Sequence, residues 1–185
     1  MLKTLSKVSS KALVVGLGLA FLKAPIVLAL TTDSATVPHD IKACETPAPG
    51  DVFVRVRVEQ LKDTEGNIRV QVYGPTADDF LEKGKKLVRV DVKTEGDGQK
   101  ICVPMPSEGE YTLVVMHDRN ANGKADFFSE GFGFSNNPKL GLGKPDAEEV
   151  VFSVEAGVTD MPVRLKYIFG ADEEQKQKRR NLRRR

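Results

Sequence analysis

The chain has 185 residues, of which 40% are hydrophobic and 29% charged, with a formal net charge of +2. This composition is typical of a globular protein and excludes a fibrous or wholly disordered chain. The charge is uneven, because residues 1–30 contain four lysines and no acid, and residues 171–185 contain seven basic residues and three acids. The remaining residues, 31–170, hold 17 basic and 23 acidic residues, a net charge of −6 that argues against binding to nucleic acid.

Residues 1–30 are predicted to be an export signal peptide. Lysines at positions 3, 7 and 11 precede the short apolar run ALVVGLGLAFL, as in the charged and hydrophobic regions of such signals. The run is too short to cross a bilayer, and Val27 and Ala29 are the small residues that precede a cleavage site, so we expect cleavage after Ala29. The alternative is an uncleaved anchor through residue 30, which Lys23 makes costly. The sequence therefore predicts an exported protein, periplasmic or extracellular.

Residues 31–50 are rich in Pro, Thr, Asp and Ala, and this composition predicts a linker. The linker contains Cys44, and the chain has one other cysteine, Cys102. Because an exported protein meets an oxidising compartment, the two cysteines are expected to form a disulfide. In the chain-entropy model, closing a loop of this length destabilises the unfolded state by about 4 kcal/mol. Two buried free thiols are the alternative if the chain is not exported.

Residues 51–170 are predicted to form one all-β domain. In DVFVRVRVEQL, valines alternate with charged residues, which is typical of a half-buried antiparallel strand. Similar short apolar runs are NIRVQVYG, LVRVDVKT, QKICVPM, EYTLVVMH, EEVVFSVEAG and MPVRLKYIFG. About seven strands in this length predict an antiparallel β-sandwich, immunoglobulin-like or transthyretin-like. One helical turn is expected in TADDFLEKGKK.

Residues 171–185, ADEEQKQKRRNLRRR, have a charge density that predicts a disordered basic tail. Two roles stay open for this tail. It can contact anionic lipid, where each basic residue near the charged surface contributes ~1 kcal/mol, or it can increase solubility without a partner.

The segment DRNANGKAD, residues 118–126, has the spacing of a calcium-binding loop. Oxygen-bearing side chains occupy positions 1, 3, 5 and 9, glycine occupies position 6, and position 7 contributes its backbone carbonyl. The predicted metal ligands are Asp118, Asn120, Asn122, Lys124, Asp126 and Glu130. The usual glutamate at position 12 is Ser129 here, and a strand precedes the loop, so the sequence predicts a calcium loop on a sheet, not an EF-hand. Because few of the ligands are charged, we expect weak calcium affinity, with a dissociation constant on the order of 10⁻⁴–10⁻³ M.

A metal-free turn is the alternative for this segment. Asn, Asp and Gly also dominate ordinary turns, because Asx side chains accept hydrogen bonds from their own backbone and tolerate left-handed conformations.

Four stretches together carry a resemblance to a known family: HDRNANGKAD, EGFGFSNN, KPDAEEVVFSV and VRLKY. Over about residues 51–169 the chain resembles the uncharacterised bacterial family called domain of unknown function 2141. The resemblance implies an exported single-domain β-sandwich and brings no activity with it. Family members usually have a longer link after the second loop aspartate, whereas only FFS separates Asp126 from Glu130 here. The short link brings Glu130 near enough to be a ligand.

The preferred hypothesis is a non-enzymatic exported module, stabilised by calcium and a disulfide, that binds an unidentified partner at the cell envelope. The alternative is a hydrolase that uses Ser135 and His117. That alternative requires the two side chains to converge in a pocket, although GFGFSNN has Asn137 where a nucleophile elbow needs glycine. His117 is expected to be a packed or surface histidine.

Overall fold

The computed structural model describes residues 35–126, 128–141 and 143–167. The predicted signal peptide, 1–30, and the predicted basic tail, 171–185, lie outside the described residues. None of the helices in the described ranges is long and apolar enough to span a membrane.

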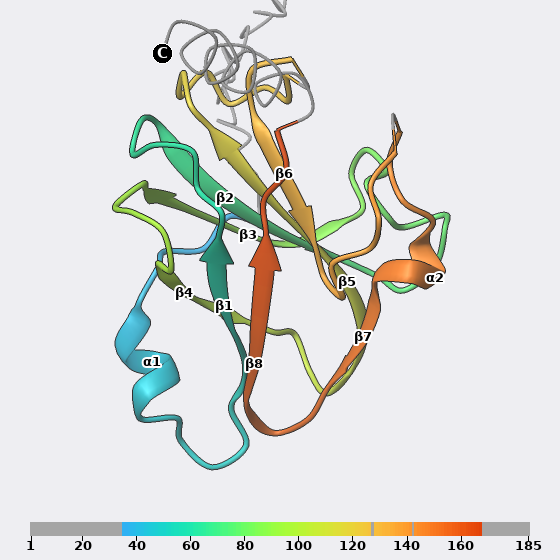
Figure 1. Cartoon of the computed structure of the whole chain (residues 1–185). Helices are drawn as coiled ribbons and strands as arrows, with labels where there is room; N and C mark the ends of the chain where they lie inside the picture. Colours follow the sequence, from blue (N-terminus) through green and yellow to red (C-terminus); the bar gives the residue numbers. More distant parts are fainter. Residues whose placement is uncertain (1–34, 127, 142, 168–185) are drawn as a thin grey trace, which may run out of the picture. The chain divides into compact units, whose positions relative to one another are not determined.

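The described residues form two β-sheets, which confirms the all-β prediction. The smaller sheet has the strand order β4-β1-β8, and the larger sheet has the path β3-β2-β5-β6, with β7 also paired to β5 (Figure 1). The strands are β1 (Val52–Glu59), β2 (Asn67–Tyr73), β3 (Lys86–Lys93), β4 (Lys100–Pro104), β5 (Gly109–Asp118), β6 (Gly131–Phe134), β7 (Val151–Val154) and β8 (Gly157–Arg164). Strands β6 and β7 share one edge of β5, with β7 beside its first half and β6 beside its second.

One strand pair departs from the predicted antiparallel arrangement. Strands β1 and β8 are parallel, with Val52 opposite Gly157 and Glu59 opposite Arg164. Parallel neighbours need a long crossover connection. Here the other strands of the domain supply that connection, because β1 and β8 are its first and last strands.

Alternating side chains explain the main core. Buried residues of both sheets meet between them, as the period-two pattern predicts. This cluster includes Val54, Val56 and Val58 of β1, Ile68, Val70 and Val72 of β2, Val88 and Val90 of β3, Leu113 and Val115 of β5, and Met161 and Val163 of β8.

A second apolar cluster lies on the other face of the larger sheet. From Tyr111 to Asp118, every residue of β5 is buried, so this strand is covered on both faces. The covering side chains come from the segment around Phe80, from β6, and from the short helix α2 (Ala147–Val150). The ring of Phe80 makes edge contacts with Tyr73 and Phe134. The helical turn expected in TADDFLEKGKK is a series of turns that buries Phe80.

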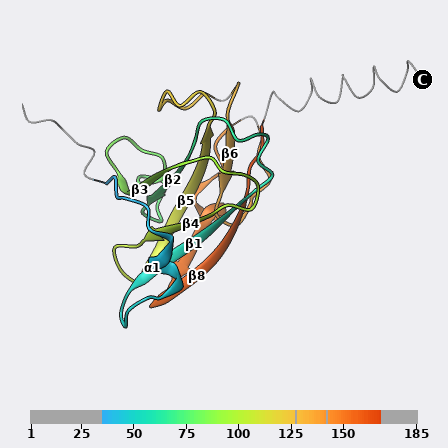
Figure 2. The ribbon, with the colours of Figure 1, turned by 90° about the vertical axis from the view of Figure 1, so that its left-hand side faces the viewer.

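From residue 35 onward, the predicted linker is part of the folded domain. Its helix α1 (Ile41–Glu45) lies against β4 and β1 (Figures 1 and 2). Ala35 and Val37 form backbone hydrogen bonds with Arg89 on the edge of β3. The predicted disulfide between Cys44 and Cys102 is present and joins α1 to β4. These long-range bonds hold the segment in place. The sequence predicts the disulfide but not the hydrogen bonds to β3.

Candidate metal centre

The loop of residues 119–130 connects β5 to β6. The two strands are antiparallel neighbours, and His117 lies opposite Gly131 at the base of the connection. The predicted calcium loop is therefore the turn of a hairpin, with a strand on each side (Figure 1). This arrangement agrees with the expectation of a loop on a sheet.

The first half of the loop is folded around the carboxylate of Asp118, which is 1% exposed. Its Oδ1 accepts a hydrogen bond from the amide of Asn122 at 3.1 Å, and its Oδ2 accepts from the amide of Gly123 at 2.8 Å. Gly123 has a φ of +76°, a conformation that favours glycine. The side-chain oxygens of Asn120 and Asn122 accept from backbone amides two residues further on. These bonds are those of successive Asx turns, so they serve a metal-free turn as well as a metal loop.

The second half of the loop joins Asp126 to Glu130. The amide of Asp126 donates to Oε2 of Glu130 at 2.9 Å. The carboxylate of Asp126 accepts from the amide of Phe128 and the hydroxyl of Ser129, and these bonds lower the pKa of Asp126.

Glu130 is buried, with 1% of its surface exposed. Its Oε1 has no hydrogen-bond partner, one of two such buried side-chain atoms in the described part of the chain. Burial raises the pKa of Glu130, the hydrogen bond from the Asp126 amide opposes this, and the nearby carboxylates of Asp118 and Asp126 raise it further. An orphaned carboxylate oxygen near two other acids is the kind of group that a cation would stabilise.

Arg69 of β2 is a residue that the sequence analysis missed. Its buried guanidinium donates from Nη1 to the carbonyl of Gly123 at 2.8 Å, and its Nη2 lies 3.9 Å from Oδ2 of Asp118. Its Nε donates to Asp91 at 2.7 Å, and Asp91 also accepts from Arg89. An arginine thus already provides positive charge behind the loop and ties it to β3.

Five of the six predicted ligands lie in this loop, and Asp118 is the last residue of β5 before it. Their carboxylates are not arranged as a metal-binding group. Within the described ranges, no group of three or more His, Cys, Asp or Glu side chains is placed to hold a metal ion. A metal here would need the amide oxygens of Asn120 and Asn122 and the carbonyl of Lys124 in addition to Asp118, Asp126 and Glu130. The donor chemistry, all oxygen with three carboxylates, fits calcium.

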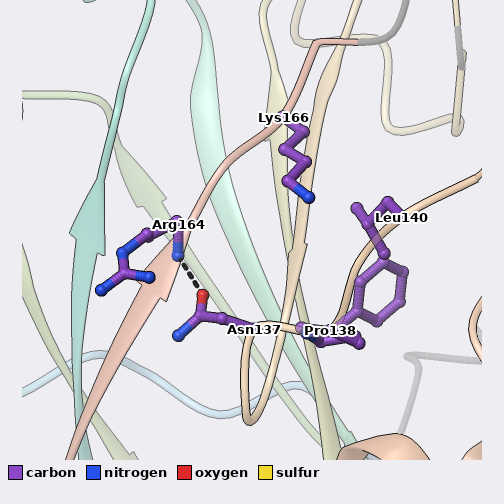
Figure 3. A pocket seen from close by; sticks show the side chains of 6 residues that line it. Asn137, Pro138, Leu140, Arg164 and Lys166 are labelled. Carbon is purple, nitrogen blue, oxygen red and sulfur yellow. Dashed lines mark hydrogen bonds between the residues drawn. The ribbon is translucent and has the colours of Figure 1, made fainter.

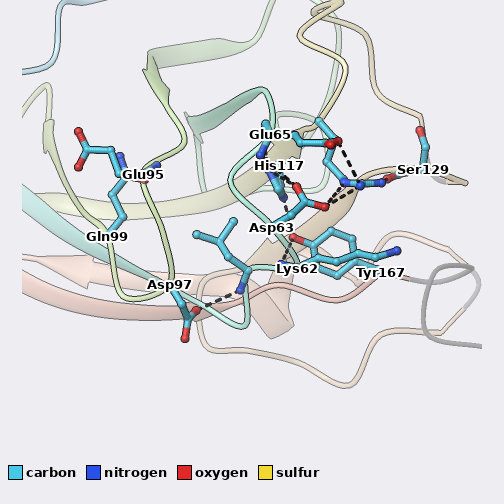
Figure 4. Close-up of polar contacts among 11 residues, drawn as sticks. Lys62, Asp63, Glu65, Glu95, Asp97, Gln99, His117, Ser129 and Tyr167 are labelled. Carbon is cyan, nitrogen blue, oxygen red and sulfur yellow. Dashed lines mark hydrogen bonds and ion pairs between the residues drawn. The ribbon is translucent and has the colours of Figure 1, made fainter. Parts of the chain in front are cut away.

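A second polar cluster surrounds His117, which is fully buried. Its Nε2 lies 2.7 Å from the carbonyl oxygen of Glu65, and its Nδ1 lies 2.7 Å from the hydroxyl of Tyr167 (Figure 4). Since a carbonyl only accepts, Nε2 carries the proton and Nδ1 accepts from Tyr167. The Tyr167 oxygen in turn accepts from the amide of Lys62. Burial lowers the pKa of His117, and it raises the pKa of Tyr167 to about 12, so the tyrosine stays protonated.

Arg119 connects this histidine cluster to the loop. Its guanidinium pairs with Asp63 at 2.6 Å and with Glu65 at 3.3 Å, and it donates to the carbonyl of Ser129.

Ser135 and His117 do not form the pair that the hydrolase alternative requires. The Ser135 hydroxyl accepts from the amide of Leu113 and donates to the carbonyl of Val150. Leu113 is four residues before His117 on β5, which separates the two positions by about 13 Å along the strand. Both ring nitrogens of His117 have other partners. This geometry removes the simplest version of the alternative.

The two asparagines of the motif GFGFSNN have a structural role. Their side chains form a set of hydrogen bonds to neighbouring segments, which we call the asparagine clamp. The side chain of Asn137 donates to the carbonyl of Pro162 and accepts from the amide of Arg164, both at the edge of β8 (Figure 3). The side-chain nitrogen of Asn136 donates to the carbonyls of Glu149 and Val151. Asn136 and Asn137 have φ values of 60° and 50°, a conformation that asparagine tolerates better than most residues. Their side-chain amides join the turn after β6 to α2, β7 and β8.

The chain belongs to a bacterial protein family described as "Uncharacterized protein conserved in bacteria (DUF2141)", which it matches over residues 56–162. This match confirms the resemblance seen in the sequence. No curated protein matches the chain.

A solved structure with detectable similarity is that of a candidate adhesin from Bacteroides ovatus, with 13% identity and a TM-score of 0.34. The similarity covers 68% of this chain and 47% of that chain, so this chain spans about half of that protein's length. A similarity at this level carries no inference about function.

Proposed function

We propose that this protein is an exported, non-enzymatic β-sandwich module whose 118–130 loop binds one calcium ion, and that it binds a partner at the cell envelope. The observation that carries the calcium proposal is the buried carboxylate of Glu130, whose Oε1 has no partner. A buried acceptor without a partner costs about 1–3 kcal/mol, and more when it is charged. A cation beside Oε1 would offset that cost.

The ligands of this ion would be Asp118, Asn120, Asn122, Lys124 through its carbonyl, Asp126 and Glu130. Calcium, with two positive charges, would offset most of the negative charge of the three carboxylates and would order the loop. This is a structural role that involves no reaction. Arg69 works against tight binding, because its Nη2 lies 3.9 Å from Oδ2 of Asp118. A weak extracellular-type site is therefore the expected outcome.

The disulfide supports an extracytoplasmic location. Cys44 and Cys102 are the only cysteines of the chain, and they are bonded to each other. Such bonds persist in oxidising compartments and are rare in the cytosol. Together with the lysine-flanked apolar run of residues 1–30, this supports export and cleavage of the signal peptide.

Thermal unfolding of the mature protein, with calcium or with a chelator, tests the calcium proposal. At a hundredfold excess of calcium over the dissociation constant, the parent protein should gain about 2.7 kcal/mol of stability. Glu130→Gln should lose this response, because it removes a charged ligand and keeps the shape of the side chain. Glu110→Gln is the matched control, since Glu110 is exposed on β5 and should leave the response intact.

Two outcomes would count against the proposal. If the melting temperature of the parent does not change with calcium, the loop is a metal-free turn. If Glu130→Gln responds as strongly as the parent, the ion binds elsewhere.

A further inference from the structure

The loop of residues 119–130 exposes an aromatic side chain. Phe128 is 73% exposed, and the other large exposed hydrophobic residue in the described ranges is Leu87, at 44%. Phe128 lies between Asp126 and Glu130, the last two predicted calcium ligands. An exposed aromatic ring on a loop is suited to enter an apolar or interfacial environment.

The C-terminal end of the described domain is held against the same loop. The hydroxyl of Tyr167 donates to His117, two residues before the loop begins. A Cβ on Gly131, the residue after the loop, would lie 2.5 Å from the Tyr167 ring. Lys166 and Phe132 exchange backbone hydrogen bonds at 2.8 and 3.0 Å. Both ends of the loop therefore contact residues 166–167, and the chain continues from a point beside the loop.

Beyond this point the sequence has three acids, Asp172, Glu173 and Glu174, followed by a strongly basic segment. Residues 175–185 contain seven Lys or Arg and no acid. Exposed lysines also lie around the exit point: Lys62 beside Tyr167, Lys124 in the loop, and Lys166 itself. The nearby acids Asp63 and Glu65 are paired with Arg119.

We propose that this end of the sandwich docks on an anionic membrane surface, with Phe128 entering the lipid interface and the basic C-terminal residues contacting the headgroups. The inference rests on the proposed function, because calcium would offset two of the three carboxylate charges that otherwise repel anionic lipid. Two weak signals are needed for stable attachment to a membrane. Here they are the exposed side chain of Phe128 and the basic segment 175–185, which follows in the sequence after Tyr167. Charge complementarity selects anionic over neutral lipid.

Vesicle sedimentation of the mature protein tests this proposal in calcium. The two probes are vesicles of phosphatidylcholine mixed with phosphatidylglycerol, and vesicles of phosphatidylcholine alone. We expect binding to the mixed vesicles, about a tenfold loss for Phe128→Ser, and about a hundredfold loss when Arg183, Arg184 and Arg185 are all changed to Gln. Leu87→Ser is the matched control and should bind like the parent, because Leu87 is on β3, away from the loop.

The outcomes separate this proposal from the calcium proposal. Thermal unfolding reports calcium binding without lipid. If calcium stabilises the parent but the protein binds neither kind of vesicle, the docking proposal is wrong. The partner at this end of the domain would then be a protein. Equal binding of Phe128→Ser and the parent, or equal binding to both kinds of vesicle, would also overturn it. If calcium has no effect on stability and the mixed vesicles still bind in a Phe128-dependent way, the calcium proposal fails, and docking through Phe128 and the basic residues is supported without a role for calcium.

Discussion

Arg69 donates a hydrogen bond from its buried guanidinium to the carbonyl oxygen of Gly123, at 2.8 Å. This contact joins the middle of β2 to the sharpest turn of the candidate calcium loop. It places a permanent positive charge 3.9 Å from Asp118, the first predicted ligand. The loop therefore has an internal cation that holds it in the absence of metal and that competes electrostatically with a bound ion.

Replacing Arg69 with methionine should have opposite effects on stability and on calcium affinity. The free energy of unfolding should fall by about 2 kcal/mol, because a buried hydrogen-bonded charge is lost while Asp91 keeps Arg89 as a partner. Calcium should bind several-fold more tightly, because the repulsive charge is gone. Urea unfolding and a calcium titration measure the two effects. Arg57→Met, at an exposed surface pair, is the control and should change stability by less than about 0.5 kcal/mol.

Glu130→Gln should stabilise the metal-free protein at neutral pH, by on the order of 1 kcal/mol, because it removes a buried charge with an unpaired oxygen. The pKa of Glu130 is raised by burial, so the folded state binds the proton more tightly than the unfolded state. In the parent, this contribution to stability is fully present below the unfolded pKa and is lost as the pH rises through the folded pKa.

The advantage of Glu130→Gln should therefore shrink as the pH is lowered toward the unfolded pKa. Urea unfolding of both proteins in chelator, from neutral to mildly acidic pH, checks this. A constant difference across that range would contradict the assignment.

Protonation of His117 should lower the free energy of unfolding of the protein in mild acid. Burial lowers its pKa, so the unfolded state binds the proton more tightly. The stability contribution is present above the unfolded value of about 6.5 and is lost as the pH falls from there through the folded pKa. His117→Leu should abolish this slope and also destabilise the protein by about 2 kcal/mol or more, since Tyr167 and the Glu65 carbonyl lose their partner. The same slope in both proteins would show that another group is responsible.

Asn137→Ala should destabilise the edge of β8. The substitution removes the donor to the Pro162 carbonyl and the acceptor for the Arg164 amide, at a cost of about 1–3 kcal/mol. Amide hydrogen exchange at Arg164 should accelerate, and this readout is local to the clamp. Lys139→Ala, an exposed neighbour, should leave that amide protected. If Arg164 exchanges at the parent's rate in Asn137→Ala, the clamp is not what protects it.

Changing both Cys44 and Cys102 to serine should destabilise the protein by about 4 kcal/mol, given their separation of 58 residues. Hydrogen exchange should increase most in α1, because the bond joins that helix to β4. An even loss of protection from hydrogen exchange over both sheets would argue against this local role.

Much of the fold was predictable from local patterns. The alternation in β1, β2 and β3 predicts which valines face the core, because successive side chains of a strand point to opposite faces. The disulfide was predictable by elimination, since only two cysteines exist. The position of the calcium-like loop on a sheet also followed from the strand that precedes it.

Other features depend on which strands become neighbours. Arg69 reads locally as one polar residue between apolar ones, and its contact with Gly123 exists because β2 pairs with β5. The helix α1, placed in a predicted linker, is held by Cys102 and lies beside strands far away in sequence. The side-chain amides of Asn136 and Asn137 bond to residues at least 13 positions away in the sequence.

The sequence by itself determined the strand pattern, the disulfide, the family and the oxygen-rich loop. The disulfide follows from the presence of two cysteines, and the others depend on residue types at short spacing. Only the tertiary structure decided that β8 runs parallel to β1, that β5 is buried on both faces, and that Glu130 is enclosed with an unpaired oxygen near Asp118. These properties arise from burial and from pairing between distant segments, and neither is encoded in the local order of residues.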